Sequence, residues 1–160
     1  PEALRVVAAS ATKPDLSWET PSGWKETRED GIRLVTFTSE GPKEGVVCAI
    51  VSLIGDAGGL KANVVRWMGQ IHMPLPAESD LNEFLASLPR TTTRAGWPVT
   101  IVDLTSLPSA QDPLAPSMMA AIVEVNENTI FVKMTGEQKA VRLNKTEFQF
   151  LCQSLTNQTK

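Results

Sequence analysis

The sequence is poor in the side chains from which metal sites and catalytic pairs are usually built. Its 160 residues include one histidine, two cysteines and no tyrosine. A histidine-rich zinc site, or a nucleophile activated by histidine, cannot be assembled from His72 and two distant cysteines. We therefore expect no metal and no cofactor, and we favour a binding role over catalysis.

The net charge is also small. The chain has 15 basic and 18 acidic side chains, which leaves a net charge of -3. No run of lysine and arginine is dense enough to follow a nucleic-acid backbone. The longest apolar run, residues 46–54, is far shorter than the ~20 residues of a membrane-spanning helix. The sequence thus argues against nucleic acid as a partner and against a spanning membrane segment.

The chain length fits one domain. A chain of 160 residues can remove about two thirds of its unfolded surface from water and form its own core. We expect a flexible N-terminal spacer over residues 1–15 and one folded domain over residues 16–157. Cys48 and Cys152 fall in a predicted strand and a predicted helix, as core residues do. Whether they form a disulfide stays open, because sequence alone does not give the distance between them.

Several short segments have the composition of β-strands. Residues 46–54 are apolar at odd and even positions alike, except Ser52, which is typical of a strand in the middle of a covered sheet. Residues 126–128 separate two further apolar segments as a hairpin turn would. A mixed or antiparallel sheet is predicted from strands at residues 32–38, 46–54, 99–104, 118–125 and 129–135.

Three other segments have helical periodicity. The first gathers five apolar side chains on one face: Leu60, Val64, Trp67, Met68 and Ile71. The second is predicted to begin at Ser79 as N-cap and to end before Pro89. The third begins at Asn144, which pairs with Glu147 as a capping box. Together these elements predict an α/β (α+β) fold, a single-domain α/β/α sandwich with a central, mostly antiparallel sheet flanked by helices.

A glycine-rich turn, residues 55–59, joins the long apolar strand to the first helix. Glycines there let backbone N–H groups converge where the helix begins, and an anion can bind at such a place. The turn lacks the lysine and hydroxyl residue of a P-loop and does not fit the dinucleotide fingerprint. Asp56 suits a turn or N-cap role better than a phosphate cradle. On the helix, three polar side chains share one flank, so the candidate ligand-binding residues are Asp56, Gly58, Gly59, Asn63, Arg66 and Gln70.

The polar flank formed by Asn63, Arg66 and Gln70 has two interpretations. Its amide and guanidinium groups can hold a carboxylate or phosphate, or they can tie the proline-rich loop of residues 105–117 to the helix. That loop has no apolar periodicity, and we interpret it as a flap. On the opposite flank Ala62, Val65 and Gly69 are predicted to lie under this flap or to dock a partner.

A second candidate surface comprises Arg90, Arg94 and Trp97. Cations beside an aromatic ring can bind a sugar or an anionic polymer. The alternative is structural, because a tryptophan that precedes Pro98 can anchor the start of a strand.

Part of the sequence resembles a family of exported bacterial proteins, many of them described as lipoproteins. The segments that carry this likeness are Gly55–Gly59, Asn63–Trp67, Gln70, Met118–Glu124, Phe131–Gly136 and Phe148–Leu155. The likeness runs from about Trp18 to Leu155. No activity is established for that family, so the resemblance implies none. It implies export, either to the periplasm or to a membrane through a lipid anchor upstream of this chain.

The order of elements also resembles the PsbP-type α/β/α sandwich. This fold occurs in an extrinsic subunit of photosystem II and in a Ran-GTPase-binding protein. The metal-associated and GTPase-contacting residues of those proteins have no matching motif here, so the resemblance implies the fold and neither role.

Two functions follow as hypotheses. The first is a non-catalytic exported accessory or binding domain that presents the polar flank and the flap to a protein or to a small anionic ligand. The alternative is a small hydrolase or anion-binding enzyme with its pocket at the glycine-rich turn, Asp56 as base and Arg66 as electrostatic stabiliser. A pocket that joins Asp56 to Arg66 would favour the enzyme.

Overall fold

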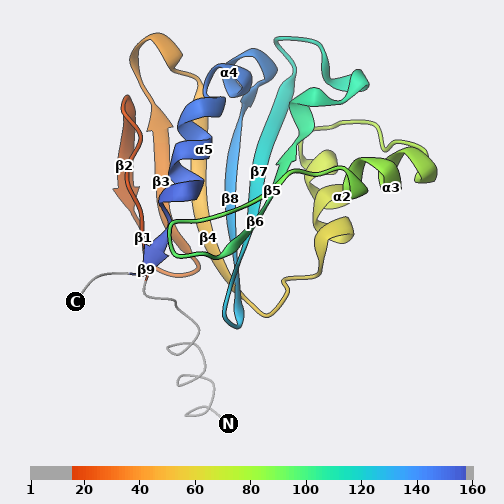
Figure 1. Ribbon diagram of the computed structural model, residues 1–160. Coiled ribbons are helices and arrows are strands. Elements are labelled where there is room, and N and C mark those ends of the chain that lie inside the picture. The colour runs from red at the N-terminus through yellow and green to blue at the C-terminus, as the bar shows by residue number, and fades with distance from the viewer. Residues whose placement is uncertain (1–15, 158–160) are drawn as a thin grey trace.

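A seven-stranded antiparallel sheet forms the middle layer of the structure, a computed structural model that describes residues 16–157 (Figure 1). The strands lie in the order β2-β3-β4-β8-β7-β6-β5. Their bounds in that order are Trp24–Arg28, Arg33–Ser39, Val46–Ile54, Asn128–Glu137, Pro116–Val125, Pro98–Asp103 and Arg90–Thr92. All of the pairings between them are antiparallel, so the sheet agrees with the predicted class.

Helices lie on both sides of this sheet. They are α2 (Leu60–Gln70), α3 (Glu78–Ala86), α4 (Gln138–Leu143) and α5 (Lys145–Ser154), with short 3-10 helices at Gly41–Lys43, Leu104–Ser106 and Pro108–Ala110. A two-stranded sheet joins β1 (Leu16–Ser17) to β9 (Thr156–Asn157) and brings the two ends of the described chain together. The predicted spacer, residues 1–15, lies outside the described residues.

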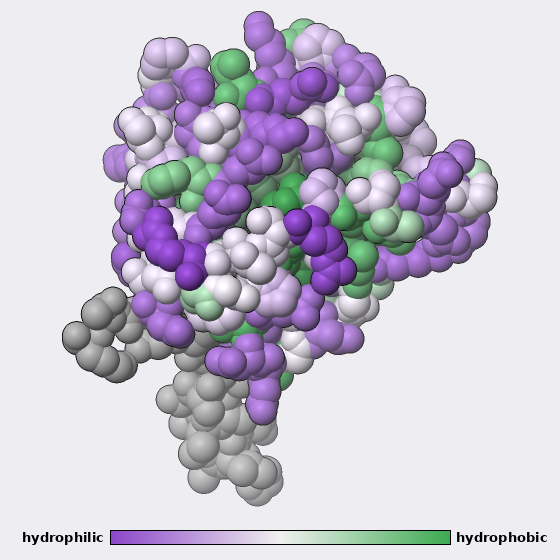
Figure 2. Space-filling view, in the orientation of Figure 1, coloured by the Kyte–Doolittle hydropathy of each residue, from purple (hydrophilic) through white to green (hydrophobic). Residues whose placement is uncertain are grey.

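One face of the sheet is closed by α4 and α5. Phe148, Leu151 and Cys152 of α5 are fully buried because their spacing turns them toward the sheet. They belong to one core with alternate residues of the strands, such as Phe37 and Ile50. Figure 2 shows hydrophilic residues over much of the surface seen in this orientation, with hydrophobic side chains visible in a hollow near its centre.

The other face carries α2 and α3. Val64, Trp67 and Met68 of α2 form a second core with strand residues, and the ring of Trp67 meets that of Phe131 on β8 edge-on at 5.1 Å. Residues that pack on both faces confirm the predicted α/β/α sandwich. This second layer does not reach the β2–β3 side of the sheet, since Thr38 is exposed there and Val47 is 43% exposed. This face is therefore covered over only part of its width.

Several elements differ from the sequence prediction. Helix α4 and the short strand β5 were not predicted, because neither is long enough to show a period. Helix α3 begins at Glu78 with Ala77 as N-cap, so Ser79 as N-cap is wrong. The loop of residues 105–117 contains two 3-10 turns, and Leu104 and Thr105 at its start are buried.

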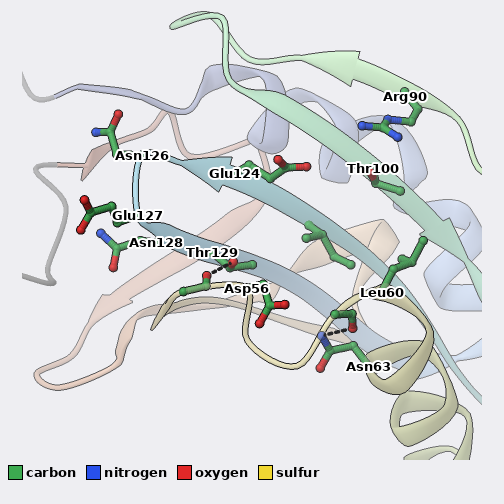
Figure 3. A pocket seen from close by; sticks show the side chains of 13 residues that line it. Asp56, Leu60, Asn63, Arg90, Thr100, Glu124, Asn126, Glu127, Asn128 and Thr129 are labelled. Carbon is green, nitrogen blue, oxygen red and sulfur yellow. Dashed lines mark hydrogen bonds between the residues drawn. The ribbon is translucent and has the colours of Figure 1, made fainter.

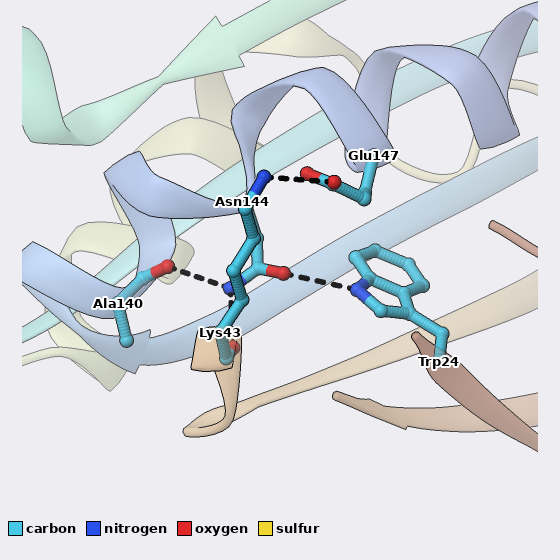
Figure 4. Close-up of polar contacts among 5 residues, drawn as sticks. All are labelled: Trp24, Lys43, Ala140, Asn144 and Glu147. Carbon is cyan, nitrogen blue, oxygen red and sulfur yellow. Dashed lines mark hydrogen bonds and ion pairs between the residues drawn. The ribbon is translucent and has the colours of Figure 1, made fainter. Parts of the chain in front are cut away.

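Asn144 connects three separate parts of the chain (Figure 4). It is the N-cap of α5 as predicted, but its side chain makes no capping hydrogen bond, so the capping box is wrong. Its Oδ1 accepts from Trp24 Nε1 at 3.0 Å, and its Nδ2 donates to Lys43 O and to Ala140 O, both at 2.9 Å. This fully buried amide therefore links β2 and the 3-10 turn at Gly41–Lys43 to the helical layer.

Gly136 permits a close backbone approach between two central strands. A Cβ placed on it would lie 2.4 Å from Gly45 O, at the point where β4 begins beside the end of β8. Only a residue without a side chain fits between these two strand ends.

We expect Asn144→Ala to lower the free energy of unfolding by about 3 kcal/mol, since it leaves Trp24 Nε1 and Lys43 O buried without their partner. Urea denaturation followed by circular dichroism measures this. Gln149→Ala, an exposed change on the same helix, is the matched control. Equal stability of the two variants would show that the amide contributes nothing.

Gly136→Ala is expected to lower the free energy of unfolding by about 2 kcal/mol or more, because its Cβ would collide with a backbone oxygen. Gly69→Ala on α2 is the control, since no atom lies within 4 Å of its added Cβ. Its expected effect is a gain of about 1 kcal/mol from helix propensity. Thermal unfolding of both variants tests the pair, and a tolerated Gly136→Ala would contradict the close approach.

Candidate functional site

A cavity of about 640 Å³ opens where α2 begins beside the β7–β8 hairpin (Figure 3). Its floor comes from three neighbouring strands and one wall from the glycine-rich turn. The lining residues are Gly55, Asp56, Gly59, Leu60, Asn63, Arg90, Thr100, Ile122, Glu124, Asn126, Glu127, Asn128 and Thr129. The cavity therefore joins the predicted turn to strand positions that lie far from it in sequence.

Hydrogen bonds fix the glycine-rich turn. Gly55 N donates to Glu127 O at 2.8 Å, and the Thr129 hydroxyl donates to Gly55 O, so both bonds tie the turn to β8 and its hairpin. Asp56 Oδ1 accepts from Gly58 N at 3.1 Å, as predicted for a turn residue. Gly58 and Gly59 have φ values of 98° and 87°, which favour glycine. The chain can thus reverse from β4 into α2 within five residues, Gly55 to Gly59.

The side chain of Asn63, in the first turn of α2, is hydrogen-bonded to the glycine-rich turn. Its Nδ2 donates to Ala57 O at 3.1 Å and to Gly59 O at 2.7 Å. The residue is 1% exposed, and its Oδ1 is buried without a hydrogen-bond partner. A buried oxygen that lacks a donor is unfavourable unless a donor from water or a ligand reaches it.

The charges around the cavity are mainly negative. Asp56, Glu124 and Glu127 supply three carboxylates, and Arg90 supplies one guanidinium. In Figure 3 Arg90 and Thr100 lie on one side of the cavity, Asp56 and Asn63 lie on the other, and Glu124 lies between them. Such a lining offers more hydrogen-bond acceptors than donors for a bound molecule.

The structure separates the six predicted ligand-binding residues into two groups. Asp56, Gly59 and Asn63 line the cavity, and Gly58 lies in the turn beside it. Arg66 and Gln70 are exposed and do not line it. Gln70 Oε1 instead accepts from Lys133 Nζ on β8 at 3.0 Å. The six candidates therefore do not form one site.

The structural interpretation of that flank is also wrong. Asn63 binds its own turn and Gln70 binds β8, whereas polar side chains of the 105–117 loop bind within the loop, as Gln111 Nε2 does to Leu107 O at 2.8 Å. The opposite flank does not lie under a flap either, because Ala62 and Gly69 are exposed and Val65 is only half-buried. The proline-rich loop therefore has no covering contact with these residues.

The second candidate surface separates into three. Arg90 lines the cavity, while Arg94 Nη1 pairs with Glu19 Oε2 at 2.6 Å. Trp97 packs against the core on the α5 side and precedes the first residue of β6. Trp97 thus anchors the start of a strand, which was the structural alternative.

The two cysteines are free and fully buried in the core on the α5 side. Burial raises the pKa of Cys48, with a further contribution from Cys152, and burial also raises the pKa of Cys152. Both thiols therefore stay protonated and act as small core residues. Within residues 16–157, no cluster of histidine, cysteine and carboxylate side chains has the arrangement of a metal site.

Sequence reasoning missed the floor of the cavity. Thr100, Glu124 and Thr129 come from strands β6, β7 and β8, and register places Glu124 opposite Thr129. The available signal was a polar residue at a position where the strand pattern calls for an apolar one. A polar residue within a strand does not show which strands are neighbours in the sheet. The cavity floor forms only because β6, β7 and β8 lie side by side.

Comparisons with known proteins give a fold and no family. No family model matches the chain, and no curated protein matches its sequence. A crystal structure from Bacteroides thetaiotaomicron is similar at 11% identity and a TM-score of 0.52, covering 93% of this chain and 48% of that one. Cyanobacterial PsbP (CyanoP) from Synechocystis is similar at 10% identity and a TM-score of 0.47, covering 91% of this chain and 94% of that one. This chain spans about half the length of the Bacteroides protein, and the likeness to that protein shows the fold alone.

None of the helices in the described part of the chain is both long and apolar enough to cross a membrane.

We expect Asn63→Ala to lower the free energy of unfolding by about 2 kcal/mol, because Ala57 O loses its side-chain donor and Gly59 O keeps only the backbone N–H of residue 63. Amide hydrogen exchange should become faster in residues 55–60 than in β7 and β8. Ala62→Ser, an exposed change one residue earlier, is the control. Unchanged exchange in the turn of the Asn63 variant would show that this side chain does not fix it.

Proposed function

We propose that the chain is a non-catalytic binding domain that holds a small polar ligand in the cavity between the glycine-rich turn and strands β6–β8. The observation that carries this proposal is the cavity at the start of α2, which combines several polar lining residues with the apolar side chains of Leu60 and Ile122. The wall is also rigid before any ligand arrives, since the turn is bonded to β8, and a preformed site loses less entropy on binding.

The lining favours a neutral or cationic ligand. Three carboxylates and one guanidinium surround the cavity, so a small anion would meet net repulsion there. The apolar side chains of Leu60 and Ile122 provide a surface for a carbon skeleton. A sugar, an amine or a zwitterionic amino acid has the required mixture of donors and apolar carbon.

The enzyme alternative has less support. It needs Asp56 as base beside Arg66 as stabiliser, but Arg66 does not line the cavity that Asp56 lines. The Asp56 carboxylate is exposed and already accepts a backbone hydrogen bond. The hydroxyl of Thr129 donates to Gly55 O and is therefore not free to act as a nucleophile.

We further propose that the domain acts outside the cytoplasm, with residues 1–15 as a spacer to an upstream lipid anchor. The likeness of residues 55–70 and later segments to exported bacterial proteins supports this. The reading frame upstream of residue 1 provides the test. A signal sequence with a lipobox would agree with the proposal, and a plain cytosolic start would contradict it.

Glu124→Trp is expected to fill the mouth of the cavity without disturbing the cores, because Glu124 is exposed at the cavity. A thermal-shift screen of monosaccharides, amines and amino acids should give stabilising compounds for the wild type. Saturation at 100 times the dissociation constant corresponds to about 2.7 kcal/mol. The variant should lose these shifts, whereas Gln149→Trp on the far side of the sheet should keep them.

Shifts that survive in Glu124→Trp would place the binding elsewhere on the molecule. A wild type that none of these compounds stabilises would contradict the proposed ligand classes.

A further inference from the structure

We propose a second site, for a phosphate-type oxyanion, formed by Arg33, Arg66 and Lys133 on the open part of the sheet beside α2. This site is separate from the cavity, and it goes beyond the proposed function. The occupant is a phosphate group, whether free in solution or carried by a lipid headgroup.

Strand register places Arg33 and Lys133 on the same face of the sheet, and Arg66 lies over that face on α2. Lys133 on β8 pairs with Ala49 on β4, and Arg33 on β3 pairs with Val51, two residues along β4. Paired and alternate positions share a face of the sheet, and Val51 packs on the α2 side. Arg66 extends from α2 over the same side, and between these side chains lies the strip of sheet that α2 leaves open.

Lys133 is held in place rather than free in solvent. Its Nζ donates to Gln70 Oε1 at 3.0 Å and lies 5.7 Å from the centroid of the Trp67 ring. The guanidinium carbon of Arg66 lies 6.0 Å from the same ring. One aromatic ring thus has two cations beside it.

The positive charges of Arg66 and Arg33 affect the pKa of Lys133. Lys133 is half-buried, and burial, followed by the charges of Arg66 and Arg33, lowers its pKa. A half-buried ammonium beside two guanidinium groups is unfavourable unless an anion offsets it.

The described residues do not supply that anion. Of the other cations in residues 16–157, five have a carboxylate partner, in the pairs Arg28–Glu26, Lys43–Glu147, Lys61–Glu78, Arg94–Glu19 and Lys145–Asp103, and four have none. Over the same range no carboxylate pairs with Arg33, Arg66 or Lys133. The carboxylate of Glu29, on the turn before β3, accepts from the hydroxyl of Thr36, which lies on the same face of the sheet, but it forms no ion pair with the three cations.

None of the three cations has a carboxylate partner among the described residues, and Lys133 donates only to the neutral amide of Gln70. An oxyanion is the ligand that supplies hydrogen-bond acceptors and negative charge together. Arginine binds such groups in a bidentate manner, and lysine adds a point charge.

The test is isothermal titration with inorganic pyrophosphate at constant ionic strength. We expect Arg66→Gln and Lys133→Met each to weaken binding about tenfold, the equivalent of one charge-assisted hydrogen bond. Lys139→Gln is the matched control, because it removes the same charge from an exposed position on α4, and it should bind as the wild type does. Equal weakening in all three variants would overturn the site, since it would indicate only a response to net charge.

Stability without ligand gives an independent readout. Lys133→Met should unfold at the same temperature as the wild type or higher, because it removes a half-buried like charge. A lower unfolding temperature would overturn the inference, since the lysine would then serve the fold itself.

A second experiment, with lipid vesicles, identifies the source of the phosphate. Sedimentation with phosphatidylglycerol vesicles, against phosphatidylcholine vesicles, should show binding that Arg66→Gln and Lys133→Met lose if the source is a lipid headgroup. Binding to pyrophosphate alone assigns a soluble phosphate. Binding to neither overturns the proposal. Glu124→Trp should leave these results unchanged, so failure of the cavity and failure of this site can be told apart.

Discussion

The pairing of β4 with β8 is the constraint on which the rest of the structure depends. Their register runs unbroken from Val46 opposite Gly136 to Ile54 opposite Asn128. It joins the N-terminal hairpin to the C-terminal half of the sheet, so residues far apart in sequence become neighbours. One end of this pairing holds the glycine-rich turn against β8, and its middle places Lys133 across from Ala49. A slip of one residue would exchange the two faces of β8 and remove both proposed sites.

The two faces of the sheet differ in how completely helices cover them. The α5 side is a closed core that holds both cysteines, and the cavity at the glycine-rich turn lies on the other face. The α2 side is covered over only part of its width, and both proposed sites lie where that cover ends. The cavity lies at the N-terminal end of α2 and has mainly carboxylates, whereas the strip of sheet along the same helix has cations. Opposite charges on the two sites give each a different class of ligand.

The sequence predicted the elements better than the contacts between them. Period and composition located α2, α5 and the long strands, because an apolar face imposes a pattern on nearby residues. Those patterns say nothing of register, so the placement of Arg33 and Lys133 on one face of the sheet, or of Asp56 and Glu124 around one cavity, could not be foreseen. The grouping of Asn63 with Arg66 failed for a related reason. Helical spacing gives a shared flank, but the Asn63 side chain is hydrogen-bonded to the glycine-rich turn and the Gln70 side chain to Lys133 on β8.

The link from Asn144 to Trp24 has a consequence for the outermost strand. β2 lies at the end of the sheet order, where unpaired backbone groups can recruit another chain. Its first residue, Trp24, is anchored to the junction of α4 and α5 and also packs against Phe37 at 5.8 Å. Fraying of β2 would therefore expose the amide of Asn144 together with the indole. The junction of α4 and α5 thus helps to keep β2 paired as the edge strand of the sheet.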